Sequence, residues 1–236
     1  MKPVRIFRHV ACEGPGYLGT FLKRHNIPFE ITCIDEGIAV ANELDDISGL
    51  IFMGGSMNVT DPLQWISEEK DLIRKAIEKN IPVMGNCLGA QLMAAALGGE
   101  ITHDPNMEIG WHQVEADINN TDNEWLKDLP ENFIPFHWHA DTFSIPETAT
   151  VLLHSKCRKN QAFAIKNSIA LQFHLEMTTE MVEEWVRLFT SDSEKEQACV
   201  QNANEILLNL EKKIDALHQY ADIFYTQWIK GLTTIY

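Results

Sequence analysis

The chain has 236 residues, 45% hydrophobic and 22% charged, which fits one large globular domain or a domain with an appendage. Its 34 acidic and 19 basic residues give a formal net charge of −15, which argues against a partner bound through nucleic-acid phosphates. No stretch approaches the ~18 uncharged apolar residues of a membrane span. Charges interrupt the N-terminal apolar run, unlike in a signal peptide. We expect a cytoplasmic protein that contacts neither nucleic acid nor membrane.

The first hundred residues alternate between strand-like and helix-like segments. Short apolar runs predict strands at residues 4–9, 29–35, 49–55 and 81–86. Apolar residues at helical spacing predict helices at residues 17–26, 61–80 and 88–98. In the second helix we expect Asp61 at the N-cap and Pro62 at the first helical position. This βαβα order predicts a parallel sheet covered by helices on both faces.

Residues 100–176 are richer in strand patterns, and a helix is predicted at residues 178–189 with Thr178 or Thr179 as its cap. We therefore expect an α/β fold of three layers, with a mostly parallel central sheet flanked by helices. The predicted catalytic domain covers residues 1–190.

The remaining tail, residues 191–236, is a predicted C-terminal helical extension. From Val200 to Trp228 its apolar residues recur at alternating steps of three and four, a heptad-like seam. One interpretation is a long helix or helical hairpin packed on its own domain. The other is a helix that forms a homo-oligomer by contacting a second copy of the chain.

The five cysteines are odd in number and widely spaced. They are Cys12, Cys33, Cys87, Cys157 and Cys199. The absence of a CxxC pair predicts neither a zinc site nor a disulfide framework, and reduced thiols are expected.

One of these cysteines lies between two glycines where a predicted strand meets a predicted helix, in Gly85-Asn86-Cys87-Leu88-Gly89. A sharp strand-to-helix turn needs small residues two positions before and after the projecting side chain. The N–H groups of the following helix favour thiolate over thiol, and the N–H of Leu88 is free to hold an oxyanion. The pattern indicates a cysteine nucleophile; the alternative is a buried cysteine beside two packing glycines.

Two further motifs supply what a cysteine nucleophile needs. His174 and Glu176 follow an apolar strand and share a face if that strand continues, so the carboxylate could orient the imidazole as a base. The segment Gly54-Gly55-Ser56-Met57 follows another predicted parallel strand, on the same sheet edge as Cys87. Its glycines allow the backbone to approach a ligand closely. No phosphate-binding fingerprint is present, which weakens a nucleotide-binding interpretation.

Together these motifs resemble those of the class I (triad) glutamine amidotransferases, whose fold is flavodoxin-like. "GNCLGAQ" is similar to the nucleophile motif G-x-C-x-G-x-Q, "GGSM" to the oxyanion loop, and "QFHLE" to the His-x-Glu motif. Among members of this family, the chain most resembles stand-alone proteins similar to the glutaminase part of GMP synthase. "EIGW" and "HADTFSIP" carry that closer resemblance.

The resemblance implies a catalytic triad. Cys87 attacks the γ-carboxamide carbon of glutamine, His174 takes the thiol proton and later protonates ammonia, and Glu176 orients His174. The backbone N–H groups of Gly55 and Leu88 hold the oxyanion.

The resemblance also implies residues that bind the substrate, and it implies no cofactor and no metal. The substrate-binding residues are Gly54, Ser56, Gln91 and His139. The segment "HWHAD" has a His-x-His spacing that metals use on a strand, but His137 and His139 have no evident further ligand in the sequence. A structural or substrate-lining role is the preferred interpretation.

Three functions remain open from the sequence. The first is a glutaminase that releases ammonia from L-glutamine, on its own or for a separate acceptor protein. The second is a γ-glutamyl peptidase acting on glutathione-like peptides or conjugates, and the stand-alone architecture favours it. The third is a non-catalytic regulatory module that retains the fold.

Overall fold

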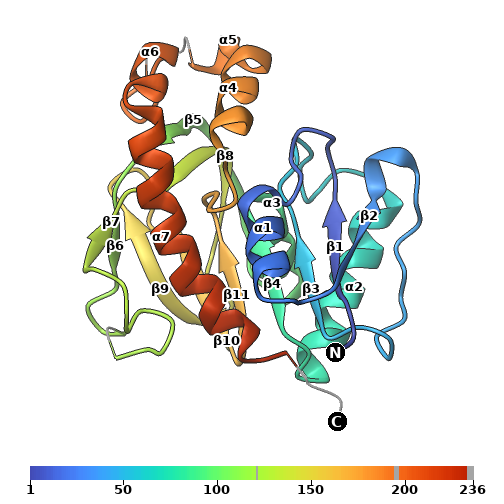
Figure 1. The fold of residues 1–236 in the computed structure, drawn as a ribbon. Helices are drawn as coiled ribbons and strands as arrows, with labels where there is room; N and C mark the ends of the chain where they lie inside the picture. Colours follow the sequence, from blue (N-terminus) through green and yellow to red (C-terminus); the bar gives the residue numbers. More distant parts are fainter. Residues whose placement is uncertain (121, 194–196, 233–236) are drawn as a thin grey trace.

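The computed structural model describes residues 1–120, 122–193 and 197–232. Within these ranges the centre of the molecule is a nine-stranded sheet with the order β2-β1-β3-β4-β11-β10-β9-β6-β7 (Figure 1). A separate antiparallel ribbon pairs β5 (Ile101–Trp111) with β8 (Phe136–Phe143).

The sheet has a parallel half and an antiparallel half. The parallel strands are β2 (Phe29–Cys33), β1 (Val4–Arg8), β3 (Gly49–Phe52), β4 (Val83–Asn86) and β11 (Ser168–Leu171). The antiparallel strands that follow are β10 (Ala162–Ile165), β9 (Thr150–Ser155), β6 (Val114–Ala116) and β7 (Asn132–Phe133). Short apolar strands with helical crossovers produce the first half, as the sequence pattern predicts.

Helices cover both faces of the sheet. The helices are α1 (Gly16–Arg24), α2 (Gln64–Glu78), α3 (Leu88–Ala96), α4 (Thr179–Leu188), α5 (Thr190–Ser193), α6 (Ala203–Leu207) and α7 (Leu210–Ile229), and residues Ile34–Glu36 form a 3-10 turn. Successive residues of β3 face opposite sides. Leu50 and Phe52 pack with α2 and α3, whereas Ile51 and Met53 pack with α1, α4 and α7. The predicted three-layer α/β fold is confirmed.

The start of α2 differs from the prediction. Leu63 occupies the N-cap position and no side chain caps the helix. The carboxylate of Asp61 instead accepts the backbone N–H of Asn58 at 2.9 Å and closes a turn before the helix. The predicted N-cap at Asp61 is therefore wrong, because a local turn competes for the same carboxylate.

The tail also differs from a single continuous seam. Asn209 adopts a left-handed conformation (φ 56°) between α6 and α7, and Leu207 on α6 is 37% exposed. From Leu210 to Trp228 the predicted seam positions are buried within the chain itself. Residues 194–196 and 233–236 of the expected extension lie outside the described residues.

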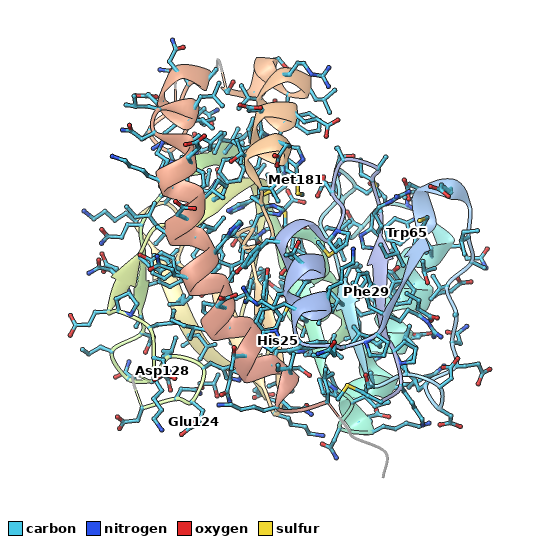
Figure 2. All side chains as sticks on the ribbon, viewed as in Figure 1. His25, Phe29, Trp65, Glu124, Asp128 and Met181 are labelled. Carbon is cyan, nitrogen blue, oxygen red and sulfur yellow. A yellow bond between two sulfur atoms is a disulfide. The ribbon has the colours of Figure 1, made fainter. Side chains whose placement is uncertain are left out.

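Helix α7 lies across the sheet face beside α1 (Figure 1). The ring of His218 stacks on Tyr17 at a centroid distance of 3.6 Å, and Trp228 packs over Gly49 of β3. Met181 of α4, labelled in Figure 2, fills the space above Gly16. The side chains of α7 are thus part of the same apolar cluster as those of α1 and α4.

The expectation of five reduced cysteines is wrong. Cys157, after β9, and Cys199, before α6, form a disulfide with their Cα atoms 6.2 Å apart. The segment of Cys199 runs beside β5, where its carbonyl accepts the N–H of Ile109 at 2.8 Å. Tertiary contacts therefore bring together two cysteines that are 42 residues apart in sequence.

No helix in the described part of the chain combines the length and the apolar character needed to cross a membrane.

Candidate active site

Cys87 lies on the sharp turn between β4 and α3. Its backbone has φ 48° and ψ −105°, a conformation that residues other than glycine rarely adopt. The N–H of Cys87 donates to the carbonyl of Leu171 in β11 at 2.8 Å, which fixes the turn to the sheet. Such a turn is typical of a nucleophile elbow.

Steric crowding explains why glycine occupies positions 85 and 89, on either side of Cys87. A Cβ atom at Gly85 would lie 2.5 Å from the carbonyl carbon of Gly89. A Cβ atom at Gly89 would overlap the carbonyl oxygen of Phe52 in β3. Any larger residue at either position would push α3 away from the sheet and displace Cys87.

His174 and Glu176 lie in direct contact behind the elbow. Strand β11 ends at Leu171, so the strand does not continue through the pair. His174 instead donates its backbone N–H to Phe136 of β8 at 2.8 Å. Its Nδ1 lies 2.8 Å from Oε1 of Glu176, and both side chains are 1% exposed. The carbonyl of Glu176 accepts the backbone N–H of Tyr17 in α1 at 2.8 Å, so the pair is anchored to both β8 and α1.

The electrostatic setting of His174 favours a proton on its ring. Burial lowers the pKa of His174, but the charge of Glu176 and the nearby sulfur of Cys87 outweigh burial and raise that pKa well above its ordinary value. Nε2 of His174 has no aligned hydrogen-bond partner among the described residues. This nitrogen therefore remains available for the thiol and for a ligand.

The glycine loop after β3 touches both other motifs. A Cβ atom at Gly54 would lie 3.0 Å from Cε1 of His174, and one at Gly55 would lie 2.8 Å from Cδ2 of Leu88. Leu88 is the first residue of α3, whose leading N–H groups have no partner inside the helix. The three motifs thus meet at one edge of the sheet.

A cavity of about 210 Å³ opens beside Cys87. Of the residues singled out from the sequence, five line it: Gly55, Ser56, Cys87, Gln91 and His139. The other four, Gly54, Leu88, His174 and Glu176, lie behind that lining. Trp138, Trp185 and Phe189 form an aromatic wall of the same cavity.

Two glutamines link the sulfur to the cavity wall. Nε2 of Gln172 donates to Sγ of Cys87 at 3.7 Å. Nε2 of Gln91 lies 3.3 Å from the carbonyl of Asp141 and 3.4 Å from Oε1 of Gln172. Gln172 immediately follows β11, and its contact with sulfur was not predicted.

Glu13 is a further acidic group at the site that sequence reasoning missed. It lines the cavity and lies against Gly54. Burial raises its pKa to about 7, Glu176 adds to the rise, and His174 and His9 oppose it. Glu13 follows β1 at the same sheet edge as the other motifs, and this position could have identified it as a residue of the site.

A second buried histidine, His9, contacts the backbone at the start of the glycine loop. Nδ1 of His9 lies 3.1 Å from the carbonyls of Met53 and Gly54, and its Nε2 lies 3.0 Å from Oε2 of Glu69. Burial lowers the pKa of His9, but the charge of Glu69 raises it overall. No spacing in the sequence connects residues 9 and 69, so this pair was not predicted.

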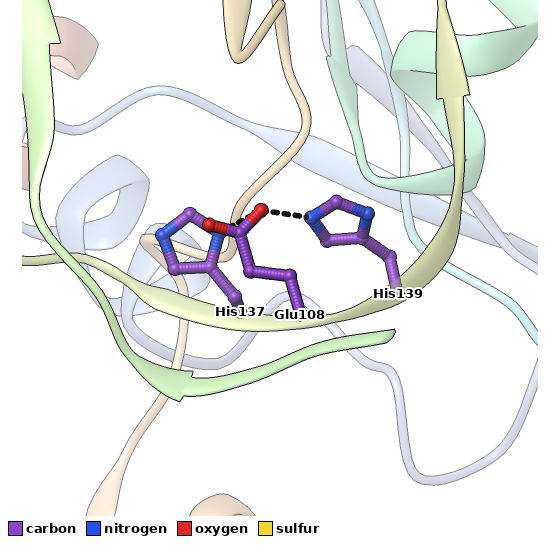
Figure 3. Close-up of side chains that lie close together, drawn as sticks. All are labelled: Glu108, His137 and His139. Atoms are coloured by element: carbon purple, nitrogen blue, oxygen red, sulfur yellow. Dashed lines mark ion pairs between the residues drawn. The ribbon is translucent and has the colours of Figure 1, made fainter. Parts of the chain in front are cut away.

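The residues that could hold a metal lie on the β5–β8 ribbon. Glu108 reaches between His137 and His139, and all three side chains are buried (Figure 3). Burial lowers the pKa of His137 to about 3. Glu108 is a carboxylate beside this histidine pair that the sequence did not reveal.

The fold and the site together define an α/β protein with a cysteine at a nucleophile elbow and a histidine–glutamate pair behind it. Residues 20–191 match the family model "Glutamine amidotransferase class-I". The chain belongs to the class I glutamine amidotransferase family, as the three motifs predict.

Solved structures agree along the whole chain. A glutamine amido transferase from Methylobacillus flagellatus is 39% identical with a TM-score of 0.95, and the match covers 100% of this chain and 97% of the other. A glutamine amidotransferase from Thermotoga maritima is 26% identical with a TM-score of 0.86, and the match covers 99% of each chain.

Curated relatives match over a shorter stretch. Gamma-glutamyl peptidase 4 from Arabidopsis thaliana is 25% identical over 154 residues, which are 63% of this chain and 61% of that protein. A glutamine-hydrolyzing GMP synthase subunit from Methanocaldococcus jannaschii is 30% identical over 135 residues, which are 56% of this chain and 66% of that protein. The chain therefore spans less than two thirds of the length of each of these relatives.

Proposed function

We propose that the chain hydrolyses the γ-carboxamide of L-glutamine through a thioester on Cys87 and releases ammonia. One observation carries the proposal: Nδ1 of His174 is bound to Glu176 at 2.8 Å while Nε2 is left for the elbow cysteine. That arrangement provides a nucleophile, a base and a group that orients the base.

The first chemical step is attack on the amide. The raised pKa of His174 favours transfer of the thiol proton to Nε2, which leaves a thiolate on Cys87. The sulfur adds to the carbon of the γ-carboxamide, and the N–H groups of Gly55 and Leu88 donate hydrogen bonds to the oxyanion that forms. His174 then returns the proton to the departing nitrogen, and ammonia leaves.

The second step hydrolyses the thioester. His174, now neutral at Nε2, takes a proton from water, and the hydroxide adds to the thioester carbon. Collapse of the intermediate releases glutamate and regenerates Cys87. The amide of Gln172, 3.7 Å from the sulfur, favours the thiolate form at both stages.

The cavity supports recognition of a glutamine-like head group. Ser56, Gln91 and His139 line it. We propose that Ser56, Gln91 and the backbone at Gly54 position the substrate amide and its amino-acid end, and that the ring of His139 forms a wall against which the substrate packs. Proximity of these groups to Cys87 would hold the carboxamide carbon within attacking distance.

A γ-glutamyl peptidase is the second candidate, favoured by the aromatic wall. Trp138, Trp185 and Phe189 offer an apolar surface for a leaving group larger than ammonia. The similarity to gamma-glutamyl peptidase 4 supports the same interpretation. The similarity to a protein named as part of a GMP synthase supports transfer of ammonia to a separate acceptor protein.

A substrate panel separates these functions. Ammonia release from glutamine and amine release from γ-glutamyl peptides are measured for the unmodified chain, for Cys87→Ala, and for His154→Ala as an exposed-histidine control. The leading proposal expects ammonia release that only Cys87→Ala abolishes. Turnover of peptides without turnover of glutamine would replace it by the peptidase. Equal rates for the unmodified chain and Cys87→Ala would contradict both.

A further inference from the structure

The β5–β8 ribbon places three buried ligand-type side chains on one face. Glu108 of β5 lies directly opposite His139 of β8, and His137 lies two residues along on the same face (Figure 3). The exposed fractions of Glu108, His137 and His139 are 0%, 0% and 5%. Their ligand atoms lie within 4.8 Å of one another.

Backbone carbonyls fix which nitrogen of each ring carries hydrogen. Nε2 of His137 lies 3.3 Å from the carbonyl of His112, and Nδ1 of His139 lies 3.0 Å from the carbonyl of Asp141. Because a carbonyl oxygen only accepts, each of these nitrogens donates. The other nitrogen of each neutral ring therefore presents a lone pair.

Both of these nitrogens lie close to the carboxylate of Glu108. Nδ1 of His137 and Nε2 of His139 lie 3.7 Å and 3.1 Å from Oε2 of Glu108. Neither nitrogen has an aligned hydrogen-bond partner within the described part of the chain. Two lone pairs and a carboxylate in one buried place repel one another unless a cation lies between them.

The His9–Glu69 pair provides an internal comparison. There, too, one ring nitrogen faces carbonyls and the other faces a carboxylate, but Nε2 of His9 forms aligned contacts with both oxygens of Glu69 at 3.2 and 3.0 Å. A shared proton accounts for that pair. On the ribbon, two ring nitrogens have no aligned hydrogen-bond partner among the described residues, and both lie beside the same carboxylate, that of Glu108.

We propose that Glu108, His137 and His139 bind one divalent transition-metal ion, with zinc as the best match. Two imidazoles and a carboxylate are preferred zinc ligands, and ligand atoms around a tetrahedral zinc lie about 3.3 Å apart. The separations of 3.1 and 3.7 Å on the ribbon bracket that value.

Surrounding groups hold the ligands in place as they do at metal centres. Each histidine donates its other N–H to a carbonyl. Oε1 of Glu108 accepts the hydroxyl of Ser155 at 2.9 Å, and Oε2 accepts the amide of Gln161 at 2.7 Å. His139 also lines the cavity beside Cys87, which gives the ion a path of entry. The ion would tie β5 to β8 and stiffen that wall of the cavity.

The test is cobalt binding to the full chain after treatment with a chelator. We expect one Co²⁺ per chain, the visible absorption of four-coordinate cobalt, no thiolate-to-cobalt band, and displacement by Zn²⁺. Glu108→Gln and His137→Asn should each weaken binding at least about 100-fold. Cys87→Ala and the exposed-histidine variant His154→Asn should leave the spectrum unchanged. This readout does not depend on the proposed hydrolysis.

Three results would overturn the site. They are no spectral change in the unmodified chain, a thiolate band that disappears in Cys87→Ala, and cobalt affinity in both ligand variants equal to that of the unmodified chain. If the ligand variants fail to fold, X-ray absorption of the unmodified cobalt form decides instead. Imidazole scattering from two histidines supports the proposal, whereas sulfur in the coordination shell contradicts it.

Discussion

The candidate active site and the β5–β8 ribbon both combine histidine with glutamate, but the rings are turned differently. Nδ1 of His174 is hydrogen-bonded to Glu176, and its Nε2 is left for the sulfur of Cys87. On the ribbon, one ring nitrogen of His137 and one of His139 are each hydrogen-bonded to a carbonyl, and the other nitrogen of each ring lies close to Glu108. The carboxylate bound to Nδ1 of His174 raises the basicity of its Nε2, whereas a carbonyl behind each ribbon histidine leaves a neutral ring with a lone pair. In these two sites the aligned contact with a carboxylate belongs to the proposed base, and the unaligned contacts belong to the proposed metal ligands.

The largest effect expected from this comparison is at His174. His174→Ala removes the group that carries the proton in both chemical steps, so turnover of the preferred substrate should fall on the order of 10⁵-fold or more. His137→Asn, on the ribbon, should reduce turnover far less and act mainly on metal binding. Steady-state rates of the two purified variants test this contrast. Similar losses of turnover in both variants would contradict the different roles assigned to His174 and His137.

A smaller loss is expected at the group behind His174. Glu176→Gln replaces a carboxylate by an amide that can donate to Nδ1, which moves the ring proton to Nε2 and blocks base catalysis. We expect kcat to fall roughly 10³-fold while the far-ultraviolet circular dichroism stays unchanged. Retention of more than a tenth of the rate would show that Glu176 does not set the tautomer.

Glu13 should make stability depend on pH. Its pKa rises from 4.5 to about 7 on folding, so the folded chain keeps a proton that the unfolded chain loses in this range. The contribution of Glu13 to stability is full below pH 4.5 and is lost as the pH rises to about 7. Glu13→Gln stays neutral and should gain up to about 3 kcal/mol relative to the unmodified chain across this window.

Urea unfolding at the two ends of that pH window measures the effect of Glu13→Gln. Asp128→Asn, at an exposed acidic residue labelled in Figure 2, is the control. Equal pH dependence of the unmodified chain and Glu13→Gln would contradict the buried, protonated carboxyl.

The smallest effect is steric and concerns the elbow itself. Gly89→Ala would drive a Cβ atom into the carbonyl of Phe52, and overpacking of this kind costs about 2 kcal/mol. Gly14→Ala is the matched control, because a Cβ atom there meets nothing within 4 Å. Thermal unfolding of both variants checks the difference, and equal melting temperatures would contradict the crowded turn.

The parallel half of the fold was predictable because its signals are local. Four apolar runs, three of them followed by a helical pattern, specify strands whose carboxyl ends share one edge. That reasoning places the glycine loop at residues 54–55 and Cys87 side by side before any contact is known.

The rest depended on contacts between distant segments. Glu69 and Glu108 meet their histidines across 60 and about 30 residues, so no spacing in the sequence identifies them. The Cys157–Cys199 disulfide likewise joins segments that only tertiary packing brings together.

Of the predicted helical seam, Val200 and Ala203 pack partly against the core and Leu207 is 37% exposed. The seam positions from Leu210 to Trp228 are buried.

The central claim is that Cys87 is the nucleophile of the site. A glutamine analogue that carries a diazoketone at the γ position is incubated with the full chain, and the modified peptides are identified by mass spectrometry. Cys12 is the internal control, because it is also a free thiol and burial raises its pKa. We predict one label per chain at Cys87, none at Cys12, and protection by excess glutamine or γ-glutamyl peptide. Labelling of Cys12 to the same extent as Cys87, or no label at Cys87, would contradict the account.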